Sequence, residues 1–246
     1  MRDSTGASGE TRPAPDVTVV VPVYGNAPTL RELYRRLRAV LDARGCSYEL
    51  LFVDDKSPDE SLAVLDELRH QGPVVVLPLP SNVGQHRAVL SGLRRTRSAA
   101  VVVLDADLQD PPEAIPLLLD RLQEGFGAVY AARRGRYQSR FRRLTSRLFK
   151  TWVHVVAGVP MDMGPFTAMD RRMVDSILSR APDRPFIPAL TAGAGLPITG
   201  VPVLRSPRPI GRSAYTTWDR LVMAASVVGG IVRPRPRDRS DSRPGP

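Results

Sequence analysis

Short runs of apolar, mostly β-branched residues alternate along the chain with longer segments in which apolar residues recur every three or four positions. The short runs predict strands buried on both faces, at residues 17–23, 48–53, 74–79, 99–104 and 127–132. The longer segments predict helices at residues 29–43, 57–69, 85–95 and 111–123. This alternation predicts the α/β class, with a mostly parallel, doubly wound sheet and helices on both of its faces.

Candidate site residues gather where the predicted strands end. They are Pro22 and Tyr24 at the first strand, Asp54 and Asp55 at the second, Asp105 and Asp107 at the fourth, and Arg133 and Arg134 at the fifth. Open α/β sheets bind their ligands in a crevice at the carboxyl ends of the strands. We therefore expect these residues to face one shared site.

The fourth strand carries the most informative stretch, VVVLDADLQDPP at residues 101–112, in which an apolar run meets the triplet Asp105-Ala106-Asp107. Mg²⁺ is commonly held by one or two carboxylates, while water and substrate phosphate complete its octahedron. A solvated acidic turn is the commoner meaning of such a triplet in isolation. Its place beside the other strand ends favours a cation site that holds phosphate.

Two common nucleotide-binding patterns are missing from the sequence. The loop after the first strand, VYGNAP, lacks the GxGxxG turn of dinucleotide-binding folds, and no GxxxxGK(S/T) cradle is present. These absences argue against a dehydrogenase and against a P-loop enzyme. We expect phosphate to be held through metal and arginine instead.

The composition fits one sizeable core, because 42% of the 246 residues are hydrophobic. A net charge of +10 indicates a polyanionic partner: nucleic acid, an anionic membrane face or phosphorylated substrates. No helix-turn-helix, RNA-recognition or zinc-finger pattern is present, so nucleic acid is not the expected partner. The single cysteine, Cys46, excludes an internal disulfide framework and is typical of a reducing cytoplasm, which is the expected location.

Both ends of the sequence are expected to be disordered, at residues 1–16 and 233–246, with one domain at 17–232. The first segment lacks the apolar region of a signal peptide. No stretch reaches the roughly 18 apolar residues that a spanning helix needs. For residues 216–232 the hypothesis is an interfacial helix, which with nearby arginines would place the protein peripherally at the inner face of the plasma membrane.

Several blocks of the chain resemble one enzyme family. VVPVYxN, FVDDKSPDE, SNVGQHRAVLSGL, VVLDADLQDPPEAI, AARR and FRRLTSRLF are similar to successive blocks of the inverting family 2 glycosyltransferases, in their dolichyl- or polyprenyl-phosphate sugar synthase branch. The similarity covers roughly residues 17–228. It implies a GT-A fold, which is Rossmann-like and here ends in helical segments, a nucleotide-sugar donor, and Mg²⁺ or Mn²⁺ as cofactor.

The resemblance also implies a role for each matched residue. The donor site would comprise Pro22, Tyr24, Phe52, Asp54, Asp55, Asp105, Ala106, Asp107, Gln109 and Arg133. Within it, Asp105, Asp107 and Gln109 would meet the metal. Asp105, Asp107 and Arg133 would be catalytic, because they stabilise the negative charge that grows on the leaving diphosphate. Arg142 and Arg143 would hold the acceptor phosphate, unless they form only a solvated basic helix face.

Two positions depart from the family pattern. Asn26 stands where many relatives carry an acidic residue. Residues 164–168 read GPFTA where relatives often show a GDFR-like block, so Pro165 replaces the acid. A hydroxyl acceptor normally needs a general base, whereas a phosphate monoester is already anionic near neutral pH. If a base is used, Asp162 is the nearest candidate, while Asp170 is expected to start a helix.

Three hypotheses remain open from the sequence. The first is a metal-dependent, inverting transferase that moves a sugar from a nucleoside diphosphate to polyprenyl phosphate, without the transmembrane helices that many members of this branch carry. The second is transfer to a soluble hydroxyl acceptor in natural-product or polysaccharide biosynthesis. The third is a non-catalytic GT-A scaffold that serves as a binding protein.

Overall fold

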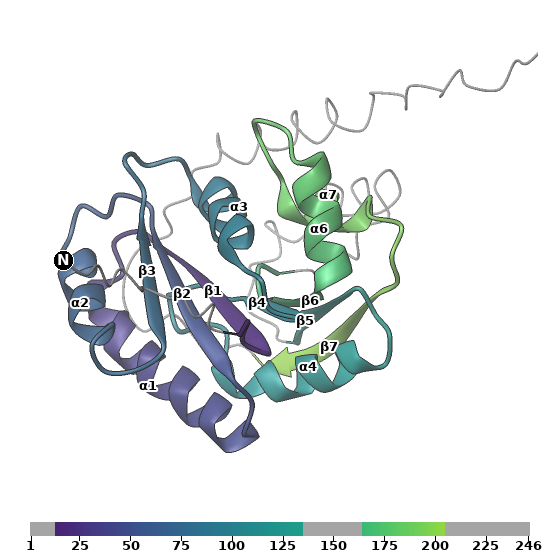
Figure 1. The fold of residues 1–246 in the computed structure, drawn as a ribbon, viewed down its shortest axis with the longest axis horizontal. Coiled ribbons are helices and arrows are strands. Elements are labelled where there is room, and N and C mark those ends of the chain that lie inside the picture. Colours follow the sequence, from purple (N-terminus) through teal and green to yellow (C-terminus); the bar gives the residue numbers. More distant parts are fainter. Residues whose placement is uncertain (1–12, 135–163, 205–246) are drawn as a thin grey trace, which may run out of the picture.

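A seven-stranded mixed sheet forms the middle layer of the computed structural model, which describes residues 13–134 and 164–204 (Figure 1). The strands are β1 Val17–Val23, β2 Tyr48–Asp54, β3 Val74–Pro78, β4 Ala100–Val103, β5 Ala128–Arg134, β6 Thr167–Asp170 and β7 Ile198–Leu204. Their order in the sheet is β3-β2-β1-β4-β6-β5-β7. The predicted α/β class and the mostly parallel sheet are confirmed.

Strand β6 is the exception to the parallel arrangement. It lies between β4 and β5 and runs antiparallel to both, with Thr167 opposite Val103 on one side and Tyr130 on the other. Strands β6 and β7 were not predicted from the sequence. The four-residue strand β6 is too short to show a period, and it ends directly before the first residue of α6.

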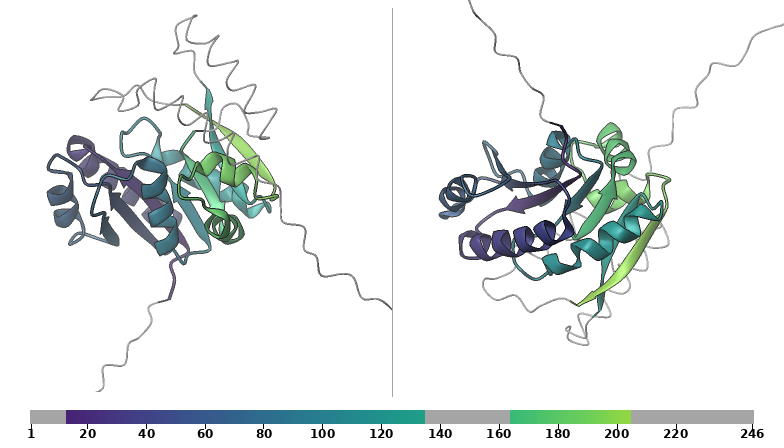
Figure 2. Two further views of the ribbon diagram at one scale, coloured as in Figure 1. Left: turned by 90° about the horizontal axis from the view of Figure 1, so that it is seen from above. Right: turned by 60° about the horizontal axis from the view of Figure 1, so that its bottom comes forward.

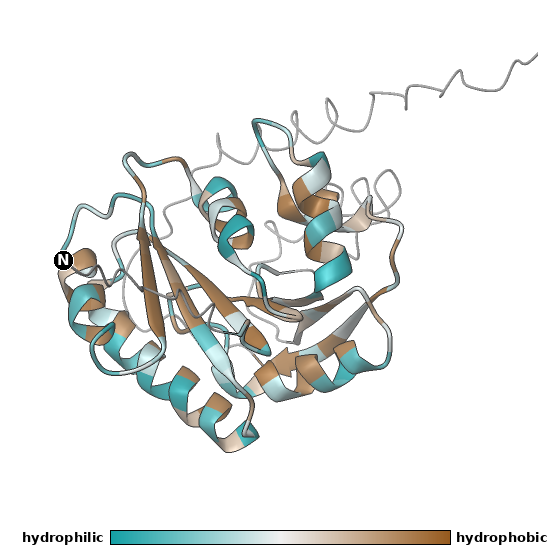
Figure 3. Cartoon of the chain, viewed as in Figure 1, coloured by the Kyte–Doolittle hydropathy of each residue, from teal (hydrophilic) through white to brown (hydrophobic). Residues whose placement is uncertain are grey.

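Helices cover both faces of the sheet, as predicted (Figures 1 and 2). One layer holds α1 Ala27–Arg44, α2 Ser61–Leu68 and α4 Ile115–Gln123, the last preceded by a 3₁₀ turn at Pro112–Ala114. The other layer holds α3 Gln85–Arg95, α6 Arg171–Arg180 and α7 Ile187–Ala192. Their apolar sides face the sheet and their polar sides face solvent (Figure 3). Among the described residues no helix is long and apolar enough to span a membrane.

The burial of β1 on both of its faces explains why its residues form an unbroken apolar run. Val19 and Val21 belong to the core beneath α1, whereas Val20 belongs to the core beneath α3, and all three have no exposed surface. A strand covered on both faces has no position at which a polar side chain would reach water. The run from residue 17 to 23 therefore carries the signature of a central parallel strand.

Helix α3 packs unusually close to the sheet through Gly92. A Cβ atom at this position would lie 2.5 Å from Val20 Cγ1 and 3.1 Å from Val53 Cγ2. We expect Gly92→Ala to lower the free energy of unfolding by about 1–3 kcal/mol, because α3 must move away from β1 and β2. Urea denaturation checks this, with Arg94→Ala on the exposed side of the same helix as control. Unchanged stability of Gly92→Ala would contradict the close packing.

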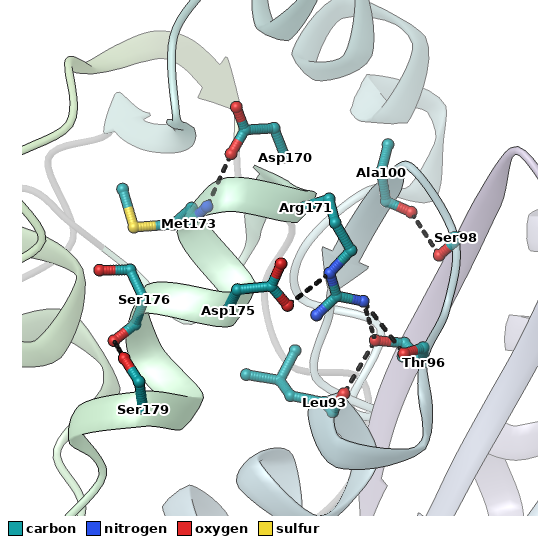
Figure 4. A network of polar contacts seen from close by, with 10 residues as sticks. All are labelled: Leu93, Thr96, Ser98, Ala100, Asp170, Arg171, Met173, Asp175, Ser176 and Ser179. Carbon is teal, nitrogen blue, oxygen red and sulfur yellow. Dashed lines mark hydrogen bonds and ion pairs between the residues drawn. The ribbon is translucent and has the colours of Figure 1, made fainter.

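A polar network joins α6 to the end of α3 (Figure 4). The Arg171 guanidinium donates to the Thr96 carbonyl at 3.0 Å and forms an ion pair with Asp175 at 2.9 Å. The Asp170 carboxylate accepts the Met173 N–H at 2.8 Å, so Asp170 caps α6 as predicted. Asp170 pairs with the first residue of β4, which places this network at the edge opposite the carboxyl end of β4.

Candidate functional site

The carboxyl ends of β1, β2 and β4 meet in the middle of the sheet. The chain passes from β1 to β2 and β3 on one side and then returns to place β4 on the other side of β1. In open α/β sheets, ligands bind at such a reversal of strand order, and we call this edge of the sheet the crevice. Tyr24 directly follows β1, Asp54 ends β2, and Asp105 lies two residues beyond the end of β4. The structure therefore brings the three predicted groups to one edge.

The loop after β1 is held by the segment that follows β2. Three of its backbone N–H groups donate to side chains of that segment: Gly25 to Ser57 Oγ at 3.2 Å, Asn26 to Ser61 Oγ at 3.0 Å, and Ala27 to Asp59 Oδ2 at 3.0 Å. The sequence pattern predicts a helix from residue 57, but α2 begins at Ser61. The side chains of Ser57, Asp59 and Ser61 instead hold the first loop.

This support leaves the Tyr24 ring open to solvent. The Tyr24 side chain is 46% exposed, and its N–H donates to the Asn26 side-chain oxygen at 3.0 Å. Asn26, the residue that replaces an acid of the relatives, is thus used within the loop. Partial burial disfavours the charged form of Asp59, yet hydrogen bonds from Ser61 and Ala27 hold the pKa of Asp59 below its usual value.

The two aspartates after β2 are almost fully buried, each 3% exposed. Asp54 closes a turn, since its carboxylate oxygens lie 3.3 and 3.4 Å from the Ser57 N–H. Asp55 reaches across to the loop before α3, where Val83 N–H donates to Oδ1 at 2.7 Å and Gly84 N–H donates to Oδ2 at 2.9 Å. Burial raises the pKa of Asp55, and the two hydrogen bonds oppose that effect. The donor contact predicted for Asp55 stays a prediction, and in the structure its carboxylate holds the loop before α3.

The Asp105-Ala106-Asp107 triplet forms the turn after β4. Asp105 is half-buried, and its Oδ1 accepts a hydrogen bond from Gln85 Nε2 at 2.5 Å. Asp107 is 9% exposed, and its Oδ1 accepts the Gln109 N–H at 3.0 Å. Leu108 between them adopts φ +60°, a left-handed conformation that costs energy for a branched residue. The turn is therefore held in one shape by contacts on both of its acidic side chains.

Thr29 ties the first turn of α1 to this triplet. Its hydroxyl lies 2.7 Å from the Ala106 carbonyl oxygen and 2.9 Å from the Asn26 carbonyl oxygen, and the side chain is buried. The sequence analysis did not single out Thr29 or Gln85. Both contacts join residues far apart in the sequence, so no local pattern marks them.

We expect Thr29→Val to lower the free energy of unfolding by about 1–3 kcal/mol, because the buried Ala106 carbonyl loses a hydrogen-bond donor while the shape of the side chain is kept. Thr29→Ser, which retains the hydroxyl, is the matched control. Urea denaturation followed by circular dichroism measures both. Equal stability of the two variants would show that the hydrogen bond contributes nothing.

The donor atoms at the triplet fit a hard divalent cation. Asp105 and Asp107 offer carboxylate oxygens, and Gln109 offers a side-chain amide oxygen on a half-buried residue. Across residues 13–134 and 164–204, no group of three or more His, Cys, Asp or Glu side chains is arranged to hold a metal. Mg²⁺ and Mn²⁺ match such a sparse set, because substrate phosphate and water complete the coordination.

Phe52 is not at the crevice. It lies inside β2 opposite Val21, and its side chain has no exposed surface in the core beneath α1. The nucleotide contact predicted for Phe52 stays a prediction, and the structure places the side chain in the core, before Val53 and Asp54 at the end of the strand. Pro22 is half-buried in β1 and pairs with Val53.

Of the four arginines predicted at the site, Arg133 and Arg134 lie within the described residues, at the end of β5. Arg133 lies in β5 opposite Val203 of β7. Because β5 runs parallel to β4 with β6 between them, its carboxyl end points to the same edge as the triplet. Arg142, Arg143 and Asp162 lie outside the described residues, as do residues 216–232 and 233–246.

The segment before β6 also reaches the crevice. Val103 pairs with Thr167 in antiparallel register, so β6 begins where β4 ends. The Phe166 carbonyl accepts the Ala131 N–H at 3.0 Å, which ties the segment before β6 to β5. Pro165, which stands where the family pattern has an acid, therefore lies in a segment at the same edge of the sheet as the triplet.

The sheet order, the two helical layers and the acidic turn after β4 define the GT-A type of glycosyltransferase fold. A mannosyltransferase of Pyrobaculum calidifontis, solved with GDP-Man and Mn²⁺, has a TM-score of 0.64 at 21% identity, over 88% of this chain and 65% of that one. Glucosyl-3-phosphoglycerate synthase of Mycobacterium tuberculosis, solved with Mn²⁺, UDP and phosphoglyceric acid, has a TM-score of 0.65 at 21% identity, over 88% and 77%.

The chain belongs to glycosyl transferase family 2, whose model matches residues 18–178. A curated relative, an uncharacterized glycosyltransferase YkcC of Bacillus subtilis, is 35% identical over 80% of this chain and 62% of its own length. The undecaprenyl-phosphate 4-deoxy-4-formamido-L-arabinose transferases of Enterobacter sp. and Pseudomonas fluorescens are 36% and 37% identical over 81% of this chain. The chain spans about three-fifths of the length of these relatives, 62% and 60%.

Proposed function

We propose that the protein transfers a sugar from a nucleoside-diphosphate sugar to polyprenyl phosphate, with a divalent cation and with inversion at the anomeric carbon. The observation that carries the proposal is the triplet Asp105-Ala106-Asp107 at the carboxyl end of β4, on the same edge as Tyr24 and Asp54. The relatives named for transfer to undecaprenyl phosphate support this choice of acceptor.

The donor would lie across the ends of β1 and β4. Asp105, Asp107 and Gln109 would hold Mg²⁺ or Mn²⁺, which when bound neutralises charge on the leaving diphosphate. The exposed Tyr24 ring offers a flat apolar surface for the nucleotide base. Arg133, at the end of β5, would contribute positive charge to the donor phosphates.

The acceptor side needs no general base in this scheme. A phosphate monoester carries a nucleophilic anionic oxygen near neutral pH. As that oxygen forms a bond to the anomeric carbon, the bond from this carbon to the β-phosphate oxygen breaks, and the configuration inverts. Proline at position 165, in the segment before β6, is compatible with an acceptor that has no proton to give up. Arg142 and Arg143 would hold the acceptor phosphate, with the protein bound peripherally to anionic lipid at the cytoplasmic face.

The test is transfer from radiolabelled UDP-, GDP- and dTDP-sugars in the presence of Mn²⁺ and undecaprenyl phosphate in detergent. We expect label in the organic phase after extraction, formed about a hundred- to a thousandfold more slowly with Asp107→Asn. Label that stays in a new aqueous product would contradict a polyprenyl acceptor and favour a soluble hydroxyl acceptor. Absence of both nucleotide binding and transfer would contradict an enzymatic role and favour a scaffold.

A further inference from the structure

A chain of hydrogen bonds runs from the end of β2 to the end of β4 through the start of α3. Asp55 accepts the N–H groups of Val83 and Gly84 at 2.7 and 2.9 Å. The next residue, Gln85, is the first of α3, and its Nε2 donates to Asp105 Oδ1 at 2.5 Å. Gln85 thus connects Asp55 to Asp105, and both carboxylates belong to the predicted donor site.

The loop that carries Gln85 has a defined shape. Gly84 adopts φ +88°, which side-chain-bearing residues rarely reach, and both oxygens of Asp55 are engaged by consecutive N–H groups. The Asp55 carboxylate is thus a negative charge bound just before the first residue of α3, where the helix dipole favours one. The loop before α3 is therefore held to the end of β2.

The body of α3 is fixed as firmly as its start. Gly92 lies against Val20 and Val53 with no room for a side chain. The His86 ring meets the Phe186 ring edge-on at a centroid distance of 5.1 Å, and Arg87 Nε donates to the Asp183 carbonyl at 2.8 Å. A side chain projecting from this helix start can therefore hold its partner in a constant direction.

We propose that Gln85 is a positioning residue that sets the direction of the Asp105 carboxylate for the divalent cation of the donor complex, and that Asp55 acts through Gln85. The inference rests on the proposed function, since it assigns Asp105 to that cation. An uncharged amide suits the task, because it orients one carboxylate oxygen without cancelling the charge that attracts the cation. Loss of such an outer hydrogen bond typically weakens metal binding by about ten- to a hundredfold.

The experiment is a titration of the full chain with Mn²⁺, followed by electron paramagnetic resonance, alone and with UDP, GDP or dTDP. Gln85→Met keeps the length of the side chain and removes the donor, and we expect Mn²⁺ affinity to fall by about ten- to a hundredfold with a changed spectrum of the bound ion. Gln71→Met, at an exposed position near the end of α2, is the matched control and should bind as the wild type does.

Asp55→Asn tests the second half of the proposal. Asparagine keeps one acceptor oxygen but turns an amide N–H₂ toward the other backbone N–H, so hydrogen exchange at residues 83 and 84 should become faster. We compare Asp55→Asn and Gln85→Met with the variant that carries both substitutions. If Asp55 acts through Gln85, the double variant should bind Mn²⁺ no more weakly than whichever single variant has the lower Mn²⁺ affinity. Thermal unfolding of each variant shows whether it is folded, and Gln85→Met carries the test if Asp55→Asn does not fold.

The outcomes separate the two proposals. Wild-type affinity and spectrum in folded Gln85→Met would overturn the positioning role while leaving the proposed function standing. Additive losses in the double variant would overturn the link between Asp55 and Gln85. Failure of the wild type to bind Mn²⁺ with any of the three nucleotides would overturn the proposed function and, with it, the inference.

Discussion

Replacing Asp107 with asparagine should lower the rate of sugar transfer by about a hundred- to a thousandfold and leave the fold intact. The substituted side chain keeps an oxygen that can accept the Gln109 N–H, now 3.0 Å from Asp107 Oδ1, so the turn is retained. What is lost is the negative charge that we assign to the cation. The effect should therefore fall on metal-dependent nucleotide binding and on transfer, not on stability.

Isothermal titration with UDP, GDP and dTDP in the presence of Mn²⁺ measures the binding part of this prediction, and a diphosphate-release assay measures the rate. Asp120→Asn is the control, since Asp120 forms an exposed ion pair with Arg44 at 2.7 Å on α4 and is remote from the crevice. Both variants should unfold at the wild-type urea concentration within error. An Asp107→Asn protein with full activity would remove the triplet from the mechanism.

Replacing Phe52 with alanine should lower the free energy of unfolding by about 3–5 kcal/mol, which is a large share of the roughly 5–15 kcal/mol of a typical domain. The side chain has no exposed surface and packs beneath α1, so its removal leaves a cavity. Phe52→Leu fills part of that space and should cost less. Urea denaturation gives both values, and nucleotide titration of Phe52→Leu shows whether the donor site is affected.

Tyr24→Ala is the comparison for Phe52→Leu, because the Tyr24 side chain is exposed whereas the Phe52 side chain is buried. The Tyr24 side chain is 46% exposed beside the crevice, so we expect a change in stability within about 0.5 kcal/mol and weaker nucleotide binding. If Phe52→Leu instead weakened nucleotide binding while the free energy of unfolding stayed unchanged, the nucleotide contact implied by the family resemblance would be supported. Packing in the core would then not be enough to explain why phenylalanine stands at this position.

The residues at the ends of β1 and β4 are held in place by segments that are distant from them in the sequence. Ser57 and Ser61 hold the loop that presents Tyr24, and Thr29 holds the backbone of the triplet. The start of α3 holds Asp105. Long-range hydrogen bonds therefore fix the part of the site that we assign to the donor.

Much of this arrangement was predictable from the sequence. Apolar runs and helical spacing gave β1 and α3 at their observed bounds and the other predicted elements within a few residues, apart from the later starts of α2 and α4, each by four residues. The rule that parallel strands bind ligands at their carboxyl ends then brought Tyr24, Asp54 and Asp105 to one edge. These successes share a cause, since periodicity and the acidic triplet are local features of the chain.

Only the tertiary structure decided how the site is built. The insertion of β6 between β4 and β5, the burial of Phe52 and the use of Asp55 to hold a loop depend on which segments meet in space. Thr29 lies 77 residues from Ala106, and Gln85 lies 20 residues from Asp105. The sequence by itself determined the elements and the acidic triplet, because short-range patterns encode them. It could not determine the contacts that orient the triplet, because a hydrogen bond between distant residues leaves no period in the chain.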